Sequence, residues 1–159
     1  MLIHDVPYQE IVNFIGNLSS EETRYYDIIK ERESLKKAVL VNGFVVNNKL
    51  VGIGGINKYF GIIPHTFYMI KSAYQEIGIG SMFSKENMEY AQKRFPFIIT
   101  IIEDGNFKAQ KIAEHRGFKF AIKRDTHFYY YKYLNSCGKL FGSIFPIIVA
   151  VYYFVRNRR

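Results

Sequence analysis

The chain of 159 residues has no tryptophan, one cysteine and four prolines. Its single thiol, Cys137, excludes a disulfide within the chain and fits a reducing compartment. The four histidines show none of the spacings typical of a metal site, so we expect no bound metal. The first residues lack the basic and apolar regions of a secretory signal peptide, and we therefore expect a cytoplasmic protein.

Acidic residues are in the minority, with 14 Asp and Glu against 22 Lys and Arg, and the formal net charge is +8. Four of the basic residues flank an apolar run near the C-terminus: Lys139, Arg156, Arg158 and Arg159. The surplus without them is +4, which is ordinary for a folded protein, so nucleic acid is not an expected partner. A hydrophobic content of 48% over this length predicts one folded domain with a proper core.

Strand-like and helix-like segments alternate over residues 1–134. Ser19 and Glu22 form a capping-box signature, which predicts a helix to about residue 35 with three inward residues: Tyr25, Ile28 and Ile29. Asn47 and Asn48 between two β-prone runs predict a hairpin. The other predicted helices start near Pro7 and span 82–93 and 106–115. The predicted strands span 2–6, 38–46, 49–59, 67–71, 97–102, 118–122 and 126–134.

A glycine-containing turn lies between a predicted strand and a predicted helix, where residues 75–81 are Gln-Glu-Ile-Gly-Ile-Gly-Ser. Such a turn directs several backbone N–H groups the same way, and the helix dipole adds partial positive charge there. Gly78 and Gly80 carry no Cβ, so a ligand can approach the backbone closely. The turn therefore predicts a phosphate-binding site.

A second segment strengthens this interpretation, because Asn106, Ala109, Gly117 and Phe118 follow another apolar strand at characteristic spacings. Together the two segments resemble the GNAT superfamily of acyl-CoA-dependent N-acetyltransferases. The resemblance covers residues 1 to about 134. It implies an α+β fold of GNAT type, with a mixed, mostly antiparallel sheet of six to seven strands. Helices would cover both faces, and the central strands would splay apart.

The resemblance also implies that acetyl-CoA is the acyl donor and that an amine of a small molecule or protein attacks it directly. The backbone of the fourth strand would bind the pantetheine arm, the glycine turn the pyrophosphate, and the later helix would contribute further contacts. The implied cofactor-binding residues are Tyr68, Met69, Ile70, Gln75, Glu76, Ile77, Gly78, Ile79, Gly80, Ser81, Asn106 and Gln110.

Glu103 is the candidate catalytic base, since it terminates the fifth predicted strand. The alternative is that Glu103 is only a solvated surface acid. His65 and His127 are interpreted as surface or partly packed histidines rather than bases. Many GNAT members carry a proton-donating Tyr seven residues after the Asn, but this chain has Ala113 there. A non-catalytic acyl-CoA-binding or interaction module is therefore the alternative function.

The C-terminal segment is set apart, because residues 140–155 contain no charged side chain. We expect a GNAT-like domain over 1–134, a linker at 135–138 and a hydrophobic tail helix with a basic end over 139–159. A helix of 16 residues is about 24 Å long, short of the roughly 30 Å core of a bilayer. The tail is expected either to associate with a membrane or to pack on its own domain or a second subunit.

Overall fold

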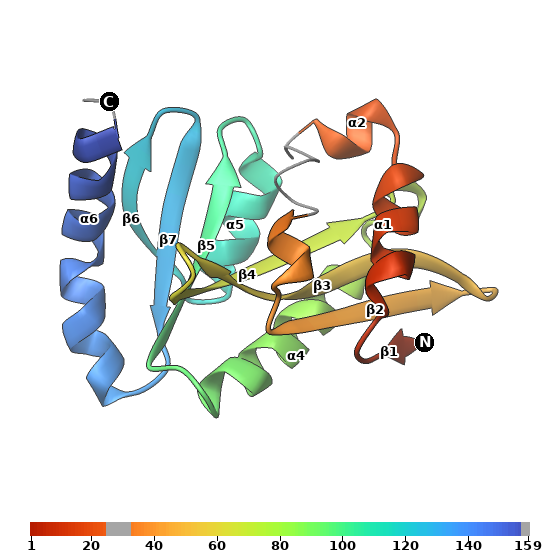
Figure 1. Ribbon diagram of the computed structural model, residues 1–159, viewed down its shortest axis with the longest axis horizontal. Coiled ribbons are helices and arrows are strands. Elements are labelled where there is room, and N and C mark those ends of the chain that lie inside the picture. Colours follow the sequence, from red (N-terminus) through yellow and green to blue (C-terminus); the bar gives the residue numbers. More distant parts are fainter. Residues whose placement is uncertain (25–32, 157–159) are drawn as a thin grey trace. The chain divides into compact units, whose positions relative to one another are not determined.

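The computed structural model describes residues 1–24 and 33–156, and for residues 140–142 and 151–156 it describes the backbone only (Figure 1). The predicted inward residues Tyr25, Ile28 and Ile29 lie outside the described residues. The chain forms two compact units, Met1–Tyr90 and Ala91–Arg159.

The first unit contains four strands: β1 (Leu2–Ile3), β2 (Leu40–Val46), β3 (Lys49–Tyr59) and β4 (Ile63–Ile70). They pair antiparallel in the order β1-β2-β3-β4. The predicted hairpin is confirmed, since Asn47 and Asn48 connect β2 to β3 with φ values of 49° and 58°. Two successive left-handed residues are typical of the turn that matches the twist of paired strands.

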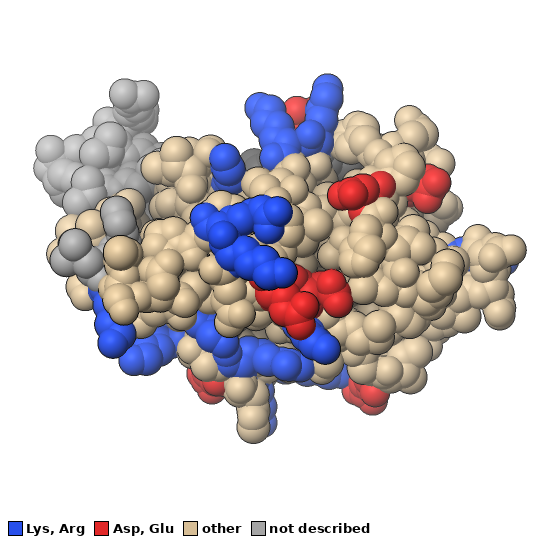
Figure 2. Space-filling model, turned by 90° about the horizontal axis from the view of Figure 1, so that it is seen from below, with Lys and Arg blue, Asp and Glu red and all other residues tan. Residues whose placement is uncertain are grey.

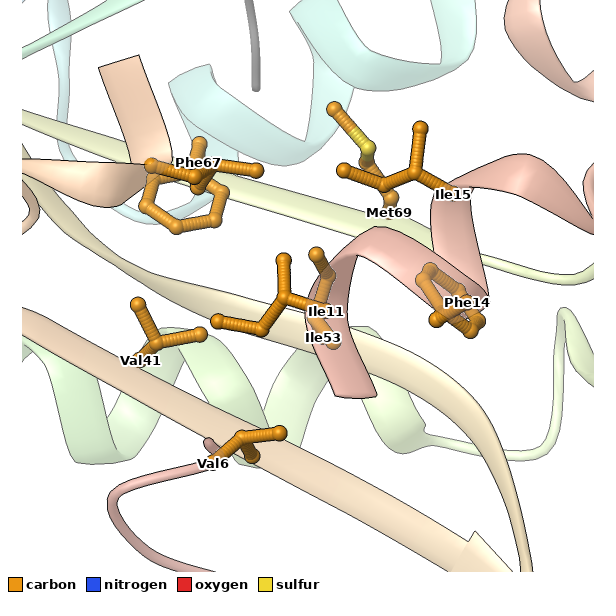
Figure 3. Packing of buried hydrophobic residues seen from close by; sticks show 9 residues of the cluster. Val6, Ile11, Phe14, Ile15, Val41, Ile53, Phe67 and Met69 are labelled. Carbon is orange, nitrogen blue, oxygen red and sulfur yellow. The ribbon is translucent and has the colours of Figure 1, made fainter. Parts of the chain in front are cut away.

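Helices cover both faces of this sheet. The helix α1 (Tyr8–Gly16) buries Ile11, Phe14 and Ile15 against Ile53 and other side chains of β2, β3 and β4 (Figure 3). The helix α4 (Ile79–Gln92) lies on the opposite face, where Phe83 is fully buried beside Val51. Ile11, Phe14 and Ile15 recur at helical spacing, which explains why this face of α1 is buried.

Short helical segments connect these elements. The helix α2 (Ser20–Thr23) begins with the predicted capping box, because Ser19 Oγ accepts from Glu22 N and Glu22 Oε2 accepts from Ser19 N at 2.8 Å. The 3₁₀ helix η1 (Ser72–Tyr74) follows β4 and leads into α4. Several boundaries differ from prediction. The largest differences are that β1 ends at Ile3 rather than 6, β4 begins at Ile63 rather than 67, and α4 begins at Ile79 rather than 82. A proline is tolerated near the start of a strand, and a glycine does not prevent a helix start.

The second unit contains β5 (Phe97–Glu103), β6 (Lys119–Arg124) and β7 (His127–Tyr133), paired antiparallel in the order β5-β7-β6. The helix α5 (Phe107–His115) lies on one face, where Tyr130 donates to Glu114. The helix α6 (Ser136–Arg156) lies on the other face, where Phe145 contacts the rings of Phe97 and Tyr131. Side chains alternate along β7, so Tyr130 and Tyr131 face different helices.

The start of α6 differs from the sequence interpretation. The expected linker at 135–138 is the cap and first turn of the helix, because Asn135 Oδ1 accepts from Gly138 N at 3.0 Å. A Cβ at Gly138 would overlap the Pro96 carbonyl, so only glycine permits this close approach. Phe145 and Val149 are each 1% exposed. One face of α6 therefore packs on its own chain, which is one of the alternatives expected for the tail.

No helix among residues 1–24 and 33–156 is long and apolar enough to cross a membrane.

Candidate functional site

The glycine turn lies between η1 and α4 in the first unit. Glu76 and Gly78 both have left-handed backbones, with φ values of 70° and 91°. The first backbone bond into the helix runs from Met82 N to Gly78 O. Five successive backbone N–H groups, those of residues 77–81, have no protein acceptor among the described residues. Consecutive free N–H groups at the start of a helix, here one of 14 residues, are the kind of arrangement that binds anions in proteins.

Contacts within the first unit hold this turn in place. Gln75 Nε2 donates to the carbonyl of Ile70 at 3.1 Å, which ties the turn to the end of β4. Ile79 is 2% exposed and packs with Val51 and Phe83, which anchors the first residue of α4. Glu22 Oε1 accepts from the backbone N–H of Ser72 at 2.6 Å. These contacts hold the backbone in place on both sides of the turn that carries the free N–H groups.

The space around the turn is open. A Cβ built at Gly78 meets nothing within 4 Å, while one at Gly80 would lie 3.5 Å from Ile70 Cδ1 and 3.8 Å from Tyr68 Cε2. Ile77 and Ser81 are exposed as well. Side chains of the first unit therefore leave room for a ligand at Gly78.

The backbone N–H groups of β4 point alternately toward β3 and toward the opposite edge of the strand. Lys71 N donates to Val51 O at 3.0 Å, and Met69 lies opposite Ile53 in the same register. Because hydrogen-bonded and non-bonded pairs alternate in an antiparallel ladder, the N–H of Met69 is also directed at β3. Those of Tyr68 and Ile70 point to the opposite edge of β4. Of the three predicted residues, Tyr68 and Ile70 therefore have N–H groups that do not donate to β3.

In the second unit, the predicted residues lie at the end of β5 and in α5. Glu103 ends β5 opposite His127 and is partly exposed. Asn106 caps α5, because its Oδ1 accepts from Ala109 N at 3.2 Å. The cap explains why an Asn is needed at this position even without a ligand. Ala113, at the position where the resemblance to GNAT proteins implies a Tyr, is 6% exposed and therefore closely packed.

Gln110 is the most informative residue of α5. Its Nε2 atom is buried and has no hydrogen-bond partner within the described residues. A buried donor left unpaired costs roughly 1–3 kcal/mol, so such an atom points to a ligand that would accept from it. Gln110 is one of the predicted cofactor-binding residues, and the lack of an acceptor for its Nε2 among the described residues is consistent with that role.

His65 has a more specific environment than the sequence indicated. Its Nδ1 lies 2.8 Å from Asn57 Oδ1, and Asn57 Nδ2 donates to Ser34 Oγ at 2.7 Å. Since the Asn57 oxygen must accept, His65 Nδ1 carries the proton. Burial lowers the pKa of His65 to about 4, so the ring is neutral near pH 7. The interpretation of His65 as a partly packed histidine is confirmed, although Asn57 gave no signal in the sequence.

Comparison with solved structures decides the fold. An acetyltransferase of the GNAT family from Streptococcus pneumoniae superposes with a TM-score of 0.65 and 19% identity, covering 85% of this chain and all of that one. The chain has the GNAT fold. The GNAT domain of S. lividans PAT matches with a TM-score of 0.68 and 11% identity, covering 83% of this chain and 89% of its own.

A third GNAT structure, the ribosomal-protein-S18-alanine N-acetyltransferase from Escherichia coli, matches with a TM-score of 0.65 and 12% identity over 85% of this chain and 94% of its own. No family model and no curated protein matches the sequence. The predicted GNAT fold class is thus confirmed. The described residues form seven strands, and in each unit helices lie on both faces of the sheet. The splaying of the central strands stays a prediction. In the part of the chain that the structure describes, no group of three or more His, Cys, Asp or Glu is placed to hold a metal ion.

Proposed function

We propose that this protein is an acyl-CoA-dependent N-acetyltransferase that moves an acetyl group from acetyl-CoA to an amine. The observation that carries the proposal is the row of five unpaired N–H groups at residues 77–81, at the N-terminus of α4 in a GNAT fold. A pyrophosphate is an anion of the right kind for such a row. Acetyl-CoA supplies the activated thioester, and the chain supplies binding, orientation and proton transfer.

The turn residues would hold the pyrophosphate through their backbone, which needs no particular side chain. Gln75 keeps the turn against β4, and its amide oxygen has no donor among the described residues. In the same unit, the N–H of Ile70 is directed away from β3 and would polarise the acyl carbonyl. In the second unit, Gln110 would donate its unpaired N–H to the cofactor, as the resemblance to GNAT proteins implies.

The ammonium form of the acceptor must lose a proton before its nitrogen attacks. Glu103, at the end of β5, is the group we assign to accept that proton, directly or through a water. His65 is a weaker base for this step, because its lowered pKa of about 4 disfavours the protonated ring. The departing thiolate would take its proton from solvent, since Ala113 has no proton to donate.

A non-catalytic acyl-CoA-binding module is the second candidate. The observation in its favour is Ala113, whose buried position leaves no room for a larger proton donor without repacking. This module would use the same turn and the same Gln110. The two candidates therefore differ only in turnover.

Turnover against a panel of amines, with cofactor binding measured in parallel, tests the proposal. We expect acetylation of at least one amine, and we expect Glu103→Gln to lower kcat by about 10²-fold with nearly unchanged affinity for acetyl-CoA. The loss should shrink as the pH approaches the pKa of the amine, where free base is abundant. Binding without turnover would favour the non-catalytic module. A Glu103→Gln variant with wild-type kcat at every pH would remove Glu103 from the mechanism.

A further inference from the structure

The helix α6 packs one face on the sheet of its unit (Figure 1). Its exposed side also carries large apolar residues. Ile147 is 61% exposed and lies about 180° around the helix from the buried pair Phe145 and Val149. Ile144 and Ile148 lie about 60° and 100° around the helix from it, both on the same side, and are 43% and 41% exposed. Nothing in the described part of the chain covers these three isoleucines. A helix that is apolar on all sides is stable only when each side meets an apolar partner.

The charge of the second unit indicates the chemistry of that partner. Residues 91–159 contain thirteen Lys and Arg but only four Asp and Glu. Residues 1–90 contain nine Lys and Arg and ten Asp and Glu. The whole positive surplus of the chain therefore belongs to the unit that carries α6. On the face of the protein in Figure 2, Lys and Arg side chains (blue) cover more surface than Asp and Glu (red).

Several of these basic residues belong to α6 or lie near it. Lys139 is exposed in the first turn of the helix, and Arg156 ends it. Lys119 lies over the ring of Tyr133, at 5.8 Å from its centre, on the side of the sheet that α6 covers. Two further arginines, Arg158 and Arg159, follow in the sequence. An exposed apolar stripe with basic residues at both ends matches the boundary between acyl chains and anionic headgroups.

We propose that α6 docks the protein on an anionic lipid membrane through Ile144, Ile147 and Ile148, while Phe145 and Val149 keep the helix attached to its own sheet. The helix lies in the plane of the interface. The isoleucines enter the region between headgroups and acyl chains, and the basic residues meet lipid phosphates.

A second copy of the chain fits this face less well. Pairing two α6 helices through the isoleucine face would bring two strongly basic units together, and like charges oppose that contact. Nucleic acid matches the charge, but its backbone is bound by polar and basic side chains, so it leaves the isoleucines without a partner.

Vesicle co-sedimentation of the full-length protein tests the proposal, with vesicles of phosphatidylcholine alone and of phosphatidylcholine mixed with phosphatidylglycerol. We expect binding to the mixed vesicles at physiological salt and weak binding to the neutral ones. The variant Ile144→Ser/Ile147→Ser/Ile148→Ser should bind at least about tenfold more weakly. Ile62→Ser is the matched control, because Ile62 is 77% exposed but belongs to the first unit, and it should bind like the wild type.

Thermal unfolding of the triple variant checks its fold, since all three residues are exposed and their replacement leaves the buried contacts of α6 intact. Light scattering without lipid is measured on the same samples. The proposal fails if the wild type ignores both kinds of vesicle. It also fails if the wild type is a dimer that the triple variant turns into monomers, because a second copy then covers the face.

Discussion

Glu22 Oε1 accepts a 2.6 Å hydrogen bond from the backbone N–H of Ser72, although 50 positions separate the two residues in the chain. The second carboxylate oxygen, Oε2, accepts from Ser19 N in the capping box of α2. One side chain therefore joins the start of α2 to the segment that leads from β4 into the glycine turn. A substitution of Glu22 should therefore affect both the stability of the first unit and the position of its glycine turn.

Glu22→Gln leaves one acceptor oxygen for two N–H donors, so we expect a loss of about 1 kcal/mol in the free energy of unfolding. The bonds from Ser19 N and then Ser72 N lower the pKa of Glu22 below its usual value of 4.5. A lowered pKa in the folded state means that this contribution is present above pH 4.5 and is lost as the pH falls further. Denaturant unfolding at neutral and acidic pH measures it. Glu21→Gln, at the exposed neighbouring position, is the control and should have almost no effect.

Gln110→Leu removes a buried donor that has no partner. The free energy of unfolding should stay unchanged or rise by up to about 1 kcal/mol, because the cost of the unpaired group disappears. Affinity for acetyl-CoA should fall by about three- to tenfold, because the cofactor loses a hydrogen bond. Thermal melts and calorimetry give the two quantities, and Gln92→Leu, at an exposed glutamine of α4, is the comparison. Reduced stability together with unchanged affinity would show that Gln110 serves the fold and not the cofactor.

The dependence of the free energy of unfolding on acidic pH tests the environment of His65. Burial lowers its pKa from 6.5 to about 4, so the unfolded chain binds a proton in this range that the folded chain does not. The folded state therefore loses up to about 3 kcal/mol between pH 6.5 and pH 4 through this group. His65→Asn keeps a donor for Asn57 Oδ1 and cannot take the proton, so its stability should fall less steeply over that range. His115→Asn, at an exposed position of α5, should follow the wild type. Parallel curves for His65→Asn and the wild type would contradict the lowered pKa.

Gly138→Ala should destabilise the docking of α6, because the added Cβ would overlap the Pro96 carbonyl. We expect a loss of about 1–3 kcal/mol in the free energy of unfolding, in the range of an overpacked contact. Hydrogen exchange should show faster exchange in α6 than elsewhere. Ser143→Ala, on an exposed part of the same helix, controls for the change in composition. An unchanged exchange rate in α6 would mean that the helix does not need this close approach.

The fold was largely predictable because its signals are local. The capping box at Ser19 and Glu22, the Asn47–Asn48 turn and the apolar stripe of α1 each depend on residues close in sequence. The glycine turn was recognisable for the same reason. The contacts that refine the site were not predictable, because they join distant residues: Glu22 with Ser72, and His65 with Asn57 and Ser34. The docking of Gly138 on Pro96 was missed because a short polar segment resembles a linker until its packing is known.

Calorimetric titration of acetyl-CoA into a pair of glycine variants tests the central claim most directly. Gly78 and Gly61 both have positive φ, 91° and 76°, and a Cβ at either meets nothing within 4 Å. Gly78→Ala and Gly61→Ala should therefore cost similar backbone strain, about 1 kcal/mol of stability each. Only Gly78 lies in the turn with the free N–H groups. We expect the wild type and Gly61→Ala to bind acetyl-CoA alike, and Gly78→Ala to bind at least about tenfold more weakly. Equal affinity of all three proteins, or no binding by the wild type, would contradict it.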